Sequence, residues 1–218
     1  MRYKCLVLDH DDTVVQSEKT LSYPFFRETI RQYRPGMDVT LSQYVQDCHS
    51  IGFVKMCQQR YGFTQEELAR EHDDWSAYIR EHTPDPFPGI DRILQRQRAA
   101  GGLICVVSHS SRETILRDYR VHFGMEPDMV YGWDLPEELR KPSPYPLEDI
   151  MKRYDLEPQD LLVVDDMKLA WLMAQPVGVE TAFAAWSKQE FPELNQEMRQ
   201  LCKYTFDSTK DLEIFLFD

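Results

Sequence analysis

The sequence predicts an α/β protein whose core is a parallel β-sheet covered by helices on both faces. Short apolar runs rich in β-branched residues recur along the chain, each bounded by turn or charged residues. Helical patterns separate most of them, and runs that are apolar on both faces are typical of strands buried in a parallel sheet. The predicted strands are residues 5–8, 103–107, 129–131, 161–164 and 179–183.

Three helices are predicted between these strands. In residues 92–100, Ile93 and Leu94 begin an inward-facing apolar stripe, and a pair of glycines then ends the helix. Residues 112–123 and 144–154 show the same kind of pattern. The alternation of strand and helix favours a single core that uses both ends of the chain.

One long interval, residues 17–82, interrupts this alternation. It contains no convincing strand, but its aromatic and aliphatic residues recur at helical spacing. A proline-rich connector at residues 84–89 follows it. We therefore expect a core formed by residues 1–16 and 83–218, with an inserted all-helical domain at residues 17–82. A helical subdomain fixed on the core is the alternative.

Composition and charge limit the classes of partner. The chain has 218 residues, with 25 Lys and Arg against 37 Asp and Glu, which gives a net charge of −12. Nucleic acid and anionic membrane both require a basic face, so neither is expected as a partner. A small anionic substrate remains compatible, because a local site can oppose the overall field. The oligomeric state cannot be read from the sequence.

The expected location is the cytoplasm. The first apolar run ends at Asp9, so no signal peptide is predicted, and the run at residues 103–107 is far too short to cross a membrane. The five cysteines include no C-x-x-C pair, which argues against structural zinc and against a disulfide scaffold.

The first predicted strand ends in the segment Asp9-His10-Asp11-Asp12-Thr13. Three carboxylates within four positions at a strand end are costly unless a cation gathers them. Ligands of open parallel sheets bind at the carboxyl ends of the strands, and Mg²⁺ prefers oxygen ligands. A solvated acidic turn is the alternative for this segment taken alone.

Three further polar positions follow in order along the chain. Ser108 ends the second strand, Lys141 stands before a proline at the start of a helix, and Asp165-Asp166 ends the fourth strand. Taken singly, such a serine is more often a helix cap and such a lysine more often a surface residue. Their order and spacing together are more specific than any one of them.

These residues resemble the four motifs of the haloacid dehalogenase-like hydrolase superfamily. The resemblance covers the core from both ends of the chain and places residues 17–82 where the family's helical C1-type cap lies. It is closest to the phosphatase type that includes phosphoglycolate phosphatases and β-phosphoglucomutase-like proteins. The matching residues are Asp9, Asp11 and Thr13, then Ser108, then Lys141-Pro142, then Asp165-Asp166.

The resemblance implies a Rossmann-like core and a Mg²⁺-dependent phosphomonoester hydrolase that acts on a small phosphorylated metabolite. Asp9 would be the nucleophile that forms an aspartyl-phosphate, because a carboxylate is ionised at neutral pH. Asp11 would protonate the leaving group and then activate water. Lys141 would join them as a catalytic residue by neutralising negative charge.

The resemblance also implies the residues that hold metal and phosphate. Mg²⁺ would be bound by Asp9, by the backbone carbonyl of Asp11 and by Asp166, with Asp165 supporting it either as a direct ligand or by holding another ligand in place. Ser108 and Lys141 would hold the phosphoryl oxygens, together with the backbone N–H of His10 and with His109, which follows Ser108 and whose exact role is left open.

Some positions depart from the commonest pattern, and some alternatives stay open. His10 stands where many members carry an apolar residue, Asp12 replaces a frequent glycine, and Ala170 stands where some members carry another acid. A sugar-phosphate mutase of the same superfamily and a non-catalytic protein that binds a phosphorylated ligand both remain compatible. A phospho-acceptor module of the receiver type fits the order of the motifs poorly.

Overall fold

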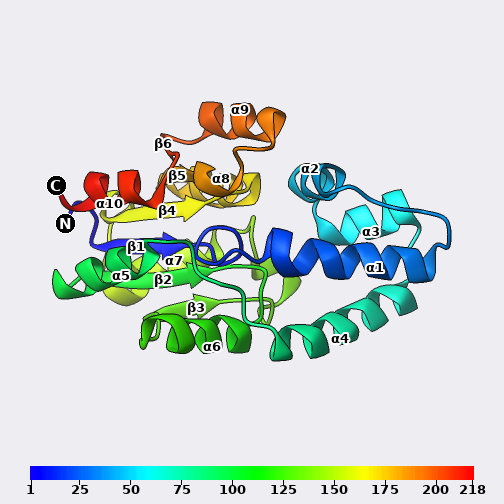
Figure 1. Cartoon of the computed structure of the whole chain (residues 1–218). Coiled ribbons are helices and arrows are strands. Elements are labelled where there is room, and N and C mark those ends of the chain that lie inside the picture. Colours follow the sequence, from blue (N-terminus) through cyan, green and yellow to red (C-terminus); the bar gives the residue numbers. More distant parts are fainter. The chain divides into compact units, whose positions relative to one another are not determined.

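The computed structural model describes residues 1–218 and divides into two compact units (Figure 1). The first unit combines Met1–Gln16 with Asp85–Asp218, and the second is Ser17–Pro84. The core unit therefore uses both ends of the chain, and one continuous segment forms the second unit. None of the helices is long and apolar enough to cross a membrane.

The core unit contains a six-stranded sheet in which every strand is parallel to its neighbours, in the order β3-β2-β1-β4-β5-β6. Its central strand, β1, is fully buried, and Val7 lies opposite Cys105 on one side and Val163 on the other. The α/β prediction is confirmed. The strands are Cys5–Leu8 (β1), Leu103–Val107 (β2), Met129–Tyr131 (β3), Leu161–Asp165 (β4), Glu180–Ala184 (β5) and Tyr204–Phe206 (β6).

Helices cover both faces of this sheet, as the two-sided apolar pattern of the strands requires. Leu6 and Leu8 face a cluster with residues of α5, α6 and α10, whereas Cys5 and Val7 face a cluster with residues of α7 and α8. Burying each of these aliphatic side chains stabilises the folded state by about 1.5–3 kcal/mol. The core helices are Ile90–Ala99 (α5), Arg112–Phe123 (α6), Tyr145–Tyr154 (α7), Lys168–Ala174 (α8), Pro192–Leu201 (α9) and Thr209–Phe217 (α10).

The sixth strand was not predicted. Tyr204–Phe206 lies at the edge of the sheet, and the polar Thr205 at its centre interrupts the apolar run that marks the other strands. The helix predicted at residues 92–100 begins two residues earlier, at Ile90 after the left-handed Gly89. The bounds of the other strands and helices that were predicted in the core agree with the observed ones to within about a residue, whereas the helices α8, α9 and α10 were not predicted.

The chain leaves and re-enters the core unit through two paired segments. Val15 and Pro86 form an isolated antiparallel bridge. The Gln16 N–H donates to the Asp85 carbonyl at 2.8 Å, and the Phe87 N–H donates to the Val14 carbonyl at 2.9 Å. The ends of the intervening segment are thus hydrogen-bonded to each other within the core unit.

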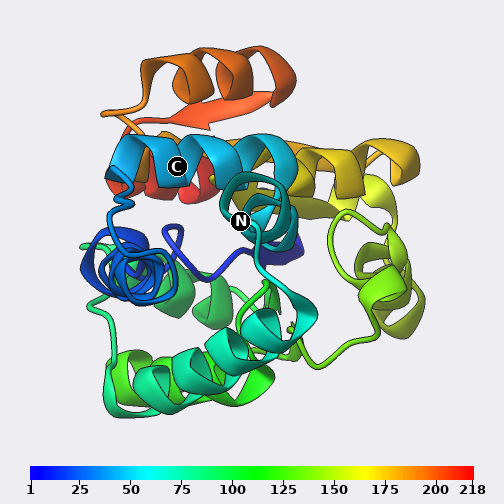
Figure 2. The same ribbon diagram turned by 90° about the vertical axis from the view of Figure 1, so that its right-hand side faces the viewer.

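The second unit contains only helices, coloured from blue to blue-green in Figure 2. The ring of Phe26 is buried and lies 5.2–6.4 Å from four aromatic rings of the same unit. Trp75 packs on Phe25 at 5.3 Å, so it contributes to the unit's own packing. The helices are a π-helical turn at Glu18–Ser22, Tyr23–Tyr33 (α1), Leu41–Ile51 (α2), Phe53–Tyr61 (α3) and Gln65–Glu81 (α4).

Replacing either of two buried tyrosines by phenylalanine should change the stability of the fold, in opposite directions. The Tyr119 hydroxyl is buried without a hydrogen-bond partner, whereas the Tyr131 hydroxyl donates to Asp149 at 2.6 Å. An unsatisfied buried hydroxyl costs free energy, so we expect Tyr119→Phe to raise the free energy of unfolding by about 1 kcal/mol. Tyr131→Phe should lower it by a similar amount. Thermal melts would measure both, as shifts of about 2–4 °C, and a destabilised Tyr119→Phe would contradict the assignment.

Candidate active site

The carboxyl ends of the central strands bring the predicted residues together. Asp9 follows β1, and its N–H donates to the Val164 carbonyl at 2.9 Å, so it lies beside Asp165 at the end of β4. Ser108 follows β2, the strand on the other side of β1. Parallel strands end at the same edge of a sheet, and this edge is where ligands bind in open α/β folds.

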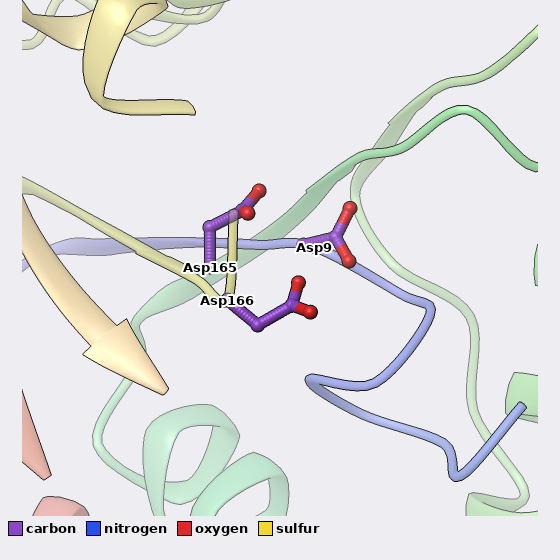
Figure 3. A group of neighbouring side chains, drawn as sticks. All are labelled: Asp9, Asp165 and Asp166. Atoms are coloured by element: carbon purple, nitrogen blue, oxygen red, sulfur yellow. The ribbon is translucent and has the colours of Figure 1, made fainter. Parts of the chain in front are cut away.

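Three carboxylates form a compact cluster at this edge. One oxygen from each of Asp9, Asp165 and Asp166 lies within 4.8 Å of the others, and all three residues are buried. Figure 3 shows them projecting from the neighbouring ends of β1 and β4. Three buried carboxylates at this separation repel one another strongly unless cations are placed among them.

Lys141 supplies one of those cations. Its Nζ lies 2.6 Å from Asp9 Oδ1 and 2.8 Å from Asp165 Oδ2, and its side chain is 6% exposed. Burial alone would lower the pKa of Lys141, but attraction to Asp165 and Asp9 outweighs burial and raises it. Lys141 therefore remains a charged ammonium among the carboxylates.

The cluster nevertheless remains short of positive charge. Burial raises the pKa of Asp9 well above its ordinary value, since the attraction of Lys141 offsets only part of the desolvation. Burial likewise raises the pKa of Asp166, against the attraction of Lys188. A divalent cation bound to these oxygens would favour their ionised forms, and Mg²⁺ prefers carboxylate oxygens. The residues present fit a magnesium ion.

Asp11 is held apart from the three clustered carboxylates by two hydroxyl groups. Ser110 Oγ donates to Asp11 Oδ2 at 2.6 Å, and Ser108 Oγ lies 3.3 Å from the same oxygen. Ser110 was not predicted as a site residue, because from the sequence it was indistinguishable from a helix cap. The cap is in fact Ser111, whose side chain accepts the Thr114 N–H.

The imidazole of His10 contacts helix α6. His10 Nε2 lies 3.0 Å from Asp118 Oδ2, and the ring stacks on Tyr119 at 6.1 Å. Both side chains of the His10–Asp118 pair are almost completely buried. The side chain therefore anchors the loop after β1 to α6.

His109 supports the loop that carries Lys141. Burial and the nearby Lys141 ammonium lower the pKa of His109 to about 4, so the imidazole is neutral at neutral pH. Its Nε2 lies 3.2 Å from the Lys141 carbonyl oxygen, which can only accept, so Nε2 donates. This bond connects the end of β2 to the lysine.

A second buried lysine joins the site, and the sequence analysis missed it. Lys188 Nζ lies 2.8 Å from Asp12 Oδ2 and 2.9 Å from Asp166 Oδ2. Its side chain is 0% exposed. Lys188 follows β5, and only its place after a strand that ends at the same edge of the sheet could have indicated it.

Solved structures resemble the chain along nearly its whole length. A protein provisionally described as a phosphoglycolate phosphatase, from Lactobacillus plantarum, superimposes with a TM-score of 0.79 at 21% identity, and the match covers 100% of both chains. CbbY from Rhodobacter sphaeroides, solved in complex with phosphate, gives a TM-score of 0.72 at 18% identity over 96% of both chains. An aspartate-to-asparagine variant of the same protein was solved with xylulose-1,5-bisphosphate (TM-score 0.72, 17% identity, 96% of both chains).

The sequence itself assigns the family. No curated protein sequence matches the chain significantly. The sequence profile of the haloacid dehalogenase-like hydrolases, however, matches residues 6–184, a span that runs from β1 to the end of β5. The resemblance seen in the motifs is therefore confirmed, and the chain belongs to the haloacid dehalogenase-like hydrolase family.

Proposed function

We propose that this hydrolase is a Mg²⁺-dependent phosphatase that cleaves a phosphomonoester of a small metabolite through an aspartyl-phosphate on Asp9. The observation that supports this proposal is the buried cluster of Asp9, Asp165 and Asp166 around the Lys141 ammonium at the carboxyl edge of the sheet. Two carboxylates with different surroundings, Asp9 and Asp11, suit the separate tasks of nucleophile and acid.

The proposed reaction has two steps. In the first, an oxygen of Asp9 forms a bond to phosphorus as the ester P–O bond breaks, and Asp11 gives its proton to the leaving oxygen. In the second, water attacks the phosphorus of the aspartyl-phosphate and gives its proton to Asp11, which releases inorganic phosphate and restores Asp9. The Ser110 hydroxyl, 2.6 Å from Asp11, would hold that carboxylate in place for both proton transfers.

Phosphoryl transfer depends mainly on positioning and on neutralising charge. Ser108, Lys141 and the backbone N–H of His10 would hold the phosphoryl oxygens. Asp9, Asp165, Asp166 and the backbone carbonyl of Asp11 would hold Mg²⁺. Bound there, Mg²⁺ would supply positive charge to the nucleophile and to the phosphoryl group.

The substrate class rests on the same site and on the relatives. Structures of similar fold hold phosphate and a sugar bisphosphate, which supports a small phosphorylated metabolite as substrate. The five cysteines are free thiols, which supports the cytoplasm as the place of action.

The test of the proposed reaction is a screen of phosphorylated metabolites with Mg²⁺ present. Release of inorganic phosphate supports the phosphatase, whereas an isomerised sugar phosphate without release would identify a mutase.

Removal of the metal should stop the reaction and lower the thermal stability of the protein. Because Mg²⁺ would bind the folded state only, we expect chelation by EDTA to abolish phosphate release and to lower the melting temperature. Adding Mg²⁺ back should restore both. Phosphate release at the full rate after exhaustive chelation would contradict the assignment.

Substitution should separate the roles of the two carboxylates. Asp9→Asn should abolish turnover of every substrate. Asp11→Asn should slow hydrolysis of alkyl phosphates by about 10²–10⁴-fold, yet still allow phosphorylation of Asp9 by an aryl phosphate, whose leaving group needs little protonation. Steady-state rates and mass spectrometry of the trapped phospho-enzyme would measure this.

The exposed Asp91→Asn is the matched control, since it makes the same chemical change on helix α5, and its rates should equal those of the unmodified chain. Normal turnover of alkyl phosphates by Asp11→Asn would show that this residue is not the acid.

We also propose that residues 17–82 act as the cap that selects the leaving group. A cap excludes water during transfer and contacts the part of the substrate beyond the phosphoryl group. Replacing residues 17–82 by a short Gly/Ser linker should then preserve hydrolysis of a small aryl phosphate but remove discrimination among metabolites. A cooperative melt is the control for folding. An unchanged substrate ranking in the folded variant would assign selectivity to the core.

A further inference from the structure

Lys188 is an unusual residue for its position. A lysine is rarely buried completely unless it is paired, and Lys188 has carboxylate oxygens of two aspartates within 2.9 Å of its Nζ. Neither the proposed nucleophilic step nor the proposed proton transfers use this side chain. Its charge nevertheless lies directly against Asp166, one of the three clustered carboxylates.

Asp12, the other partner of Lys188, shows that this pair is built into the loop. Asp12 has a φ of 55°, in the left-handed region that favours glycine. A glycine there would relieve that strain but would leave Lys188 without its second carboxylate. The backbone of the loop is fixed independently, since the Asp12 N–H donates to the Val15 carbonyl at 2.7 Å.

The backbone of Lys188 is also fixed. Its N–H donates to Ala185, and its carbonyl accepts the Phe191 N–H at 3.2 Å and the Asn195 side-chain amide at 3.3 Å. The ammonium lies 5.9 Å from the centre of the Phe191 ring. These contacts hold the ammonium between the loop after β1 and the end of β4, and leave it little freedom to move away.

We propose that Lys188 is a positioning residue whose charge holds Asp12 and Asp166 in place and sets how strongly the carboxylate cluster binds its divalent cation. This inference rests on the proposed function, because that cation is the proposed Mg²⁺. The Lys188 ammonium and the metal would both lie against Asp166, so their positive charges repel each other and the lysine weakens the binding of the metal. The negative charge of Asp12 offsets part of this repulsion, so the metal binds more tightly than it would beside Lys188 alone.

Three variants test this proposal by calorimetric titration of the full chain with Mg²⁺ alone and by melts in EDTA. Lys188→Met removes the repelling charge, so we expect Mg²⁺ to bind at least about tenfold more tightly and the metal-free protein to melt at a lower temperature. Asp12→Asn removes one negative charge from beside the lysine, so its ammonium should repel the cation more strongly and Mg²⁺ should bind more weakly. Asparagine tolerates the left-handed backbone of this position.

The double variant gives the sharpest test, because it removes one charge of each sign. Its affinity for Mg²⁺ should return to near that of the unmodified chain. In melts of metal-free protein, Asp12→Asn should destabilise the unmodified chain but stabilise the Lys188→Met variant, in which Asp12 is a buried charge without its cation. A merely structural lysine would lower the melting temperature and leave the affinity for Mg²⁺ unchanged.

Lys4→Met is the matched control. Lys4 pairs with Asp160 at 3.1 Å, is 63% exposed and precedes β1, at the opposite end of the strand from Asp9. It makes the same change of charge and should leave the affinity for Mg²⁺ unchanged. Equal or weaker binding of Mg²⁺ by Lys188→Met, or unchanged or tighter binding by Asp12→Asn, overturns the proposal, and Asp12→Asn decides it if Lys188→Met does not fold.

These measurements use no substrate, so they are independent of turnover. If the unmodified chain binds Mg²⁺ but releases no phosphate from any ester, the proposed function fails while the comparison of affinities still judges Lys188. If phosphate is released but the variants bind Mg²⁺ alike, only the role of Lys188 fails.

Discussion

The structure depends on keeping several buried carboxylates together at one edge of a parallel sheet. Hydrophobic packing fixes the strands, and the parallel register then places Asp9 and Asp165 side by side. Desolvation opposes their charged forms, so cations must lie among them. Two lysines supply these cations. Lys141 lies in the segment after β3 and Lys188 in the segment after β5, and each places its ammonium against the carboxylates.

Much of the core could be predicted because its signals are local. A buried strand in a parallel sheet has a continuous apolar run, and a helix between strands has its own period and its own end signals. The acidic residues predicted at the ends of two different strands accordingly lie at one edge of the sheet, as the cluster of Asp9, Asp165 and Asp166 shows. The edge strand Tyr204–Phe206 was missed because the polar Thr205 stands at its centre, so no continuous apolar run marks it, whereas the equally short Met129–Tyr131 has one.

The contacts that could not be predicted are those made between distant segments. Lys188 and Asp12 are separated by 176 positions in the sequence, and no spacing rule connects them. Ser110 looks like a helix cap until the structure shows its hydroxyl on Asp11 and the cap at Ser111. The direction of the His10 ring depends on Asp118, a buried acid on α6 that only the tertiary fold brings to the loop after β1. Sequence patterns identify the chemistry of a strand end, but tertiary contacts select the partners.

The central position of β1 has a consequence for how the chain folds during synthesis. Cys5 pairs with Leu103 on one side and with Leu161 on the other, so β1 has no partner strand until the whole segment that leads to β2 has been synthesised. The intervening Ser17–Pro84 segment makes its packing contacts within itself and has no such wait. Pairing between distant strands is slow because the entropy of closing a long loop is lost before the stabilising contacts form. Until its partners are made, an apolar strand of this kind is an unpaired edge of the sort that promotes aggregation.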